Sequence, residues 1–160
     1  MTPHLTSIVA IEIFDGPVGG LALGDQGDSW TFRAVAWDDE RNIRIFLLNA
    51  LPAAVAEEIV TLLGRSEPPR WPAWWVRTPI AESEWERIQL LLAQRGPPGF
   101  VAATGDLLAT RGTAWLRLEA PRDLETVEAL LREREETGAR FEVWMELLRR
   151  LEDHKDNRHP

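Results

Sequence analysis

A chain of 160 residues with 44% hydrophobic side chains is long enough to fold as one domain around its own core. Its net charge of −8 opposes contact with nucleic-acid phosphates, so we expect no nucleic-acid partner. Cysteine is absent, which excludes disulfides, thiolate metal sites and a cysteine nucleophile. The N-terminal residues lack the basic and apolar regions of a signal peptide, and no long apolar run follows. We therefore expect a cytoplasmic protein with no membrane contact.

The first fifty residues carry the pattern of an antiparallel sheet. β-branched and alternating apolar side chains predict strands at 8–14, 21–23, 30–37 and 43–48. Glycine-rich or acidic turns separate these strands, and the first turn consists of Asp15, Gly16 and Pro17. Because the connections are short, we expect a meander in which consecutive strands pair with each other.

Four helices are predicted in the rest of the chain. Pro52 and Pro121 suit the first turn of the first and third helices, and Ser83 with Glu86 predicts a capping box for the second. Short strands are expected at 100–103, 106–110 and 114–118. The pattern leaves open whether these strands extend the first sheet. The third and fourth helices predict an antiparallel hairpin at the C-terminal end.

Together these elements predict an α+β fold, with an antiparallel meander and about four helices that include a C-terminal helical hairpin. We expect one domain over residues 1–152, with residues 65–79 as an internal connector rich in proline and tryptophan. Residues 153–160 are strongly polar and are expected to be a disordered tail.

The side chains that most enzymes use are scarce. The three histidines lie within a few residues of the chain ends, and none of the four serines stands in a nucleophile motif. Glycines 16, 19, 20, 24 and 27 do not form a phosphate-binding loop and instead predict hairpin turns. Carboxylates are plentiful, but the acidic turns at 25–28 and 38–40 flank one strand and should lie at opposite ends of it. We expect no catalytic residues, no metal and no other cofactor.

The most suggestive segment is residues 70–77. It combines stiff prolines, flat indole rings and flanking cations, and its candidate binding residues are Arg70, Trp71, Trp74, Trp75 and Arg77. Tryptophan and arginine are enriched at the centres of protein interfaces. The same side chains can stack on a ligand ring or enclose a cation, and tryptophans can also simply cover a core. Core packing, partner contact and a small-ligand pocket therefore stay open for this segment.

Four short motifs carry a resemblance to a known group of proteins. They are Phe14-Asp15-Gly16-Pro17 with Gly20, Trp30-Thr31-Phe32, Ile45-Phe46-Leu47-Leu48 and Phe141-Glu142-Val143-Trp144. The chain resembles small uncharacterised bacterial proteins that combine an aromatic-Asp-Gly-Pro turn with a sheet and a tryptophan-bearing helix. The usual tyrosine of that turn is Phe14 here, and the resemblance covers the first third of the chain plus one helix. It implies no activity, although such stand-alone proteins include immunity and adaptor proteins.

Two classes of function follow. The first is a non-enzymatic protein-interaction module, such as an immunity protein or an adaptor, whose acidic surface steers a basic protein partner. The alternative is a carboxylate- or metal-dependent enzyme, or a small-ligand-binding domain. A homodimer that pairs the helix at 139–152 is a further option, because Phe141, Trp144, Leu148 and Leu151 recur on one side of it.

Overall fold

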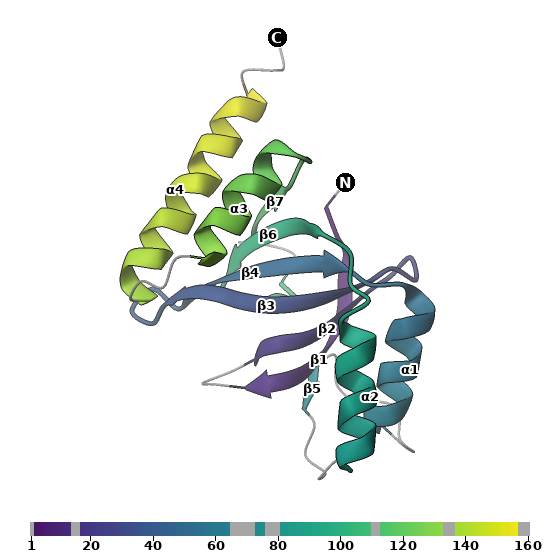
Figure 1. Ribbon diagram of the computed structural model, residues 1–160. Coiled ribbons are helices and arrows are strands. Elements are labelled where there is room, and N and C mark those ends of the chain that lie inside the picture. The colour runs from purple at the N-terminus through teal and green to yellow at the C-terminus, as the bar shows by residue number, and fades with distance from the viewer. Residues whose placement is uncertain are drawn as a thin grey trace. The chain divides into compact units, whose positions relative to one another are not determined.

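The computed structural model describes residues 2–13, 17–64, 73–75, 81–109, 113–132 and 137–156 (Figure 1). Its elements are β1 (Leu5–Ile13), β2 (Pro17–Gly24), β3 (Ser29–Asp38), β4 (Ile43–Ala50), α1 (Ala53–Gly64), β5 (Ala73–Trp75), α2 (Glu82–Leu92), β6 (Pro98–Thr104), β7 (Ala114–Arg117), α3 (Arg122–Arg132) and α4 (Thr137–Asp156). The α+β class predicted from the sequence is confirmed, with an antiparallel sheet, four helices and two of those helices at the C-terminal end.

The strands follow the order β5-β1-β2-β3-β4-β6-β7. β1 pairs with β2, β2 with β3 and β6 with β7 in antiparallel register, as a meander requires. β5 departs from this pattern because it pairs with β1 in parallel. The question left open by the sequence is answered, since β6 and β7 continue the sheet beyond β4.

The chain groups into two compact units. The first comprises residues 1–33 and 48–98, and the second comprises residues 34–47 and 99–160, so that β3 and β4 contribute to both. The expectation of one domain over residues 1–152 stays a prediction. Within the connector expected at 65–79, only β5 belongs to the described residues. None of the described helices is both long enough and apolar enough to cross a membrane.

In the first unit, α1 and α2 lie side by side and share a core with β1 and β2 (Figure 1). α1 starts directly after Pro52, whose carbonyl accepts the backbone hydrogen bonds of Val55 and Ala56. Its buried Ile59 packs in one cluster with Ile88 and Leu91 of α2. Each such side chain contributes about 1.5–3 kcal/mol when fully buried. This packing sets the position of α2 on the sheet.

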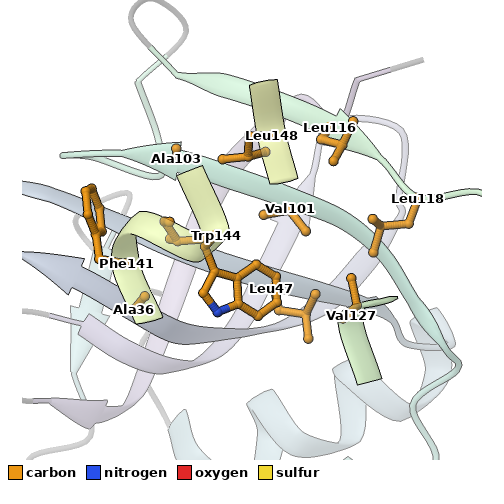
Figure 2. Packing of buried hydrophobic residues seen from close by; sticks show 11 residues of the cluster. Ala36, Leu47, Val101, Ala103, Leu116, Leu118, Val127, Phe141, Trp144 and Leu148 are labelled. Atoms are coloured by element: carbon orange, nitrogen blue, oxygen red, sulfur yellow. The ribbon is translucent and has the colours of Figure 1, made fainter. Parts of the chain in front are cut away.

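In the second unit, α3 and α4 lie side by side and are anchored by tryptophan (Figures 1 and 2). Trp144 is 1% exposed and packs in one cluster with Leu47 of β4 and Val127 of α3. Phe141 and Leu148 lie on the same stripe of α4 and join that cluster, as their spacing predicts. The stripe is thus buried within this unit, and a homodimer through residues 139–152, which stays a prediction, would have to use the opposite side of α4.

Three local predictions differ from the structure. The strand expected at 106–110 is absent from its described residues, 106–109, which form a turn instead. Thr104 and Asp106 bind nearby backbone groups there: the Thr104 Oγ1 accepts from the Asp106 N–H, and the Asp106 Oδ1 accepts from the Leu108 N–H. The expected capping box is wrong, since α2 begins at Glu82 after Ala81, without a side-chain cap. α4 is helical to Asp156, which includes part of the segment expected to be disordered.

Candidate ligand-binding pocket

The binding residues predicted from the sequence lie mostly outside the described part of the chain. This applies to Arg70, Trp71 and Arg77, and to Asp15 and Gly16 of the predicted turn, while Pro17 begins β2. Trp74 and Trp75 belong to β5, where their backbones pair with Val9 and Ala10 of β1, and their side chains are not described. The interaction role of residues 70–77 therefore stays a prediction.

Two carboxylates of the acidic turns, those of Asp25 and Asp38, have structural partners. Asp38 accepts backbone hydrogen bonds from Glu40 and Arg41, which closes the turn between β3 and β4. Asp25 Oδ2 lies 2.9 Å from the Nδ1 of His4. No three histidine or acidic side chains gather into a metal-binding group within the residues that the structure describes. These side chains thus close turns and tie down the N-terminal strand.

A pocket of about 320 Å³ lies in the first unit. Its volume falls at the lower end of the range that small-molecule sites occupy, about 300–1,000 Å³. The lining combines apolar, neutral polar and basic side chains from four strands and the end of α2. The lining residues are Ile11, Gly19, Gly20, Thr31, Phe32, Arg33, Asn49, Gln89, Leu92, Ala93 and Arg95. We call it the Gly20 pocket.

Two glycines inside β2 contribute to the pocket wall. Ala10 pairs with Gly20 and Glu12 pairs with Gly19, so Ile11 is an extra residue in β1 and forms a bulge. Gly20 has a φ of +153°, and a Cβ at this position would overlap the carbonyl oxygen of Val9. Only glycine fits there. The interpretation of all five glycines as hairpin turns is corrected here, because Gly19 and Gly20 lie within a strand.

Two neutral polar side chains, Thr31 and Asn49, come from the central strands. The Leu51 N–H donates to the Ser29 carbonyl at 2.9 Å, and the Ser29 Oγ donates to the Leu51 carbonyl at 2.7 Å, which places these two residues opposite each other. Thr31 lies two positions further along β3 and Asn49 two positions back along β4. Since side chains alternate along a strand, these two residues lie on the same face as Ser29 and Leu51.

The segment after α2 is held to the end of β4. The Gly96 N–H donates to the Ala50 carbonyl at 2.8 Å, and the Asn49 Nδ2 donates to the Gly96 carbonyl at 3.0 Å. Arg95 directly precedes Gly96, and both its backbone N–H and its Nη1 donate to the Leu92 carbonyl at 3.3 Å. The two hydrogen bonds of Gly96 therefore fix the position of the backbone from which the Arg95 side chain extends.

The charged residues among the described lining of the pocket are both basic. Its charged lining residues are Arg33 and Arg95, and no acidic residue is among the described lining residues. Thr31, Asn49 and Gln89 add a hydroxyl and two amides. Such a lining offers many hydrogen-bond donors and suits a ligand that accepts hydrogen bonds.

Sequence reasoning missed this site. Its residues are spread from Ile11 to Arg95, and only the tertiary structure brings them together. The one local signal is Gly19-Gly20 beside strand-forming residues, since a glycine inside a strand often marks a bulge or a close backbone approach. Comparison of the chain with protein families, with curated proteins and with solved structures found no match.

Proposed function

We propose that this chain is a binding domain that takes a small ligand in the Gly20 pocket. The observation that carries the proposal is a pocket of ligand size with mixed apolar and polar walls. Its walls are built on strands and on a packed helix end, which hold side chains in place more firmly than loops do. The described lining residues include no carboxylate, histidine, serine or lysine, and these are the usual general bases and nucleophiles. Binding without turnover is therefore the proposed activity.

A thermal-shift screen with a library of small metabolites tests this proposal. A ligand that binds only the folded chain, present at about ten times its Kd, stabilises it by roughly 1.4 kcal/mol. For a chain of this size that raises the Tm by about 3–6 °C. The volume restricts ligands to the smaller metabolites, and we expect dissociation constants of roughly 10 µM to 1 mM.

A pair of variants shows whether a hit occupies this pocket. Ala93→Trp places an indole in the pocket from an exposed position just after α2, and we expect it to abolish the shift. Ala54→Trp makes the same change at an exposed position of α1 outside the lining, and we expect it to retain the shift. A library without hits, or hits that Ala93→Trp leaves unchanged, would contradict the proposal.

A further inference from the structure

We propose that this chain forms a two-fold homodimer in which β7 pairs antiparallel with β7 of a second copy, so that the two sheets join into one. The inference concerns a surface of the second unit and does not depend on the Gly20 pocket. It follows from the direction of the backbone groups of β7, from the regularity of this strand, and from the fit of its side chains to a second copy of themselves.

β7 is the last strand of the sheet in the described part of the chain. It pairs with β6, and just beyond it the Leu118 N–H donates to the Gly99 carbonyl at 2.9 Å. Backbone groups of an antiparallel strand alternate between its two sides, so those of Leu116 and Leu118 face β6. Those of Trp115 and Arg117 face the outer edge, where they have no backbone partner among the described residues. The edge thus presents two N–H groups and two carbonyls to another strand.

β7 lacks the features that usually keep edge strands apart. Natural edges carry prolines, lysines or bulges. β7 contains no proline and no lysine, and its four residue pairs with β6 follow one another without a register shift. On one face of the strand, Leu116 packs in the cluster of Trp144 (Figure 2). Because side chains alternate along a strand, Trp115 and Arg117 lie on the opposite face.

The side chains of β7 complement a second copy when the pairing is centred on Leu116. Each Trp115 then stands opposite Arg117 of the other copy. In β6, Phe100 stands opposite Arg117 and Ala102 opposite Trp115. Each Arg117, which is exposed, would therefore lie between Phe100 of its own chain and the indole of the second copy. A guanidinium stacks well on aromatic rings, and opposite side chains are the contacts that stabilise a sheet.

The neighbouring registers fit less well. A pairing centred on Arg117 sets two like charges opposite each other, which is destabilising. A pairing centred on Trp115 sets Arg117 opposite Thr113 and leaves the cation without a second ring. The register centred on Leu116 also uses the outward backbone groups of both Trp115 and Arg117 in both copies. Because this interface is two-fold, it closes as a dimer and does not extend into a fibre.

The indole that receives the cation is already held in place. The rings of Phe100 and Trp115 meet edge to face, with centroids 6.3 Å apart and an interplanar angle of 87°. Trp115 is half-buried, so part of its ring stays accessible. Two short strands bury less than the roughly 1,200 Å² at which stable interfaces begin. We therefore expect a weak dimer, with a dissociation constant of about 10–100 µM.

Sedimentation velocity of the full chain between about 5 and 500 µM tests the association. Arg117→Pro removes an outward N–H and leaves the pairing with β6, so we expect it to weaken the dimer at least about tenfold. Arg149→Gln is the matched control, because Arg149 is an exposed residue of α4, and it should associate like the parent chain. If Arg117→Pro does not fold, Arg117→Glu removes the stacked cation and should weaken the dimer at least about fivefold.

Disulfide crosslinking tests the register, because the chain has no cysteine of its own. A mixture of Trp115→Cys and Arg117→Cys chains, treated with oxidised glutathione, places two cysteines directly opposite with Cα atoms about 5.5 Å apart, a distance that a disulfide spans. Either variant alone places them about 8–9 Å apart, which is too far. We expect the mixture to crosslink at least about fivefold faster than either variant alone or than Arg149→Cys.

A monomer at the highest concentration would overturn the proposal. So would a dimer that the Arg117 variants leave unchanged, or one that Arg149→Cys crosslinks as fast as the mixture, since the interface would then lie elsewhere. Single variants that crosslink as fast as the mixture would overturn the register centred on Leu116 and the stacking that depends on it. None of these outcomes affects the ligand screen of the Gly20 pocket, so the two proposals are tested separately.

Discussion

Gly20→Ala is the substitution with the sharpest expected effect on the pocket. Gly20 has a φ of +153°, a region that side-chain-bearing residues rarely adopt and that costs about 1–3 kcal/mol. The added Cβ would also overlap the Val9 carbonyl oxygen and lie 3.0 Å from the Ile11 nitrogen. β1 and β2 must then separate locally, and each ladder hydrogen bond lost costs about 1 kcal/mol. We expect the free energy of unfolding to fall by about 3–5 kcal/mol in total, which is a large share of the stability of a typical domain.

Gly27→Ala isolates the backbone part of this cost. Gly27 also has a positive φ, +76°, but no atom lies within 4 Å of a Cβ built there. Its substitution should cost about 1–2 kcal/mol through backbone conformation alone. Urea denaturation followed by tryptophan fluorescence and circular dichroism would measure both variants. If Gly20→Ala costs no more than Gly27→Ala, the close approach of β1 to β2 at the bulge is wrong, and so is the described pocket wall.

Substitutions at Trp144 and Asp123 test packing and a buried side-chain hydrogen bond in the second unit, and Trp85 of the first unit serves as the control for Trp144. Trp144→Ala should lower the free energy of unfolding by about 3–5 kcal/mol, because Trp144 is 1% exposed. Trp85→Ala on α2 should lower it by only about 1–2 kcal/mol, because Trp85 is 36% exposed. Equal losses of the two variants in urea denaturation would argue against the core of Figure 2. Asp123→Ala should lower the free energy of unfolding by about 1–2 kcal/mol, since the buried Asp123 Oδ2 accepts the Glu119 N–H at 2.9 Å at the start of α3. A thermal midpoint within about 1 °C of the parent chain would refute that role.

Much of the sheet and all four helices were predictable because their signals are local. Alternating apolar residues locate β3 and β4, and the structure extends the predicted strands by only a few residues at their ends. The stripe of Phe141, Trp144 and Leu148 predicts the buried side of α4 for the same reason. Each of these signals depends on periodicity, which a sequence shows without any knowledge of the contacts.

Features that depend on distant residues were not predictable. β5 has three residues, and only its register against Ile8, Val9 and Ala10 makes it a strand. The segment 106–110 has apolar residues suited to a strand, but over the described residues 106–109 backbone N–H groups donate to the Thr104 and Asp106 side chains and close a turn instead. Such side-chain hydrogen bonds compete with strand pairing for the backbone groups, and the spacing of apolar residues does not predict them.

The Gly20 pocket combines local and long-range features, and its walls are held by contacts within the chain. The bulge at Ile11 holds the Gly19–Gly20 side, the two hydrogen bonds of Gly96 hold the Arg95 side, and the core around Ile88 holds α2. Each wall is thus fixed by contacts that no ligand has to supply. A preformed site loses little conformational entropy on binding, so even a small ligand can bind measurably. The pocket therefore offers a more direct test of function than the tryptophan segment, whose partner would first have to be found.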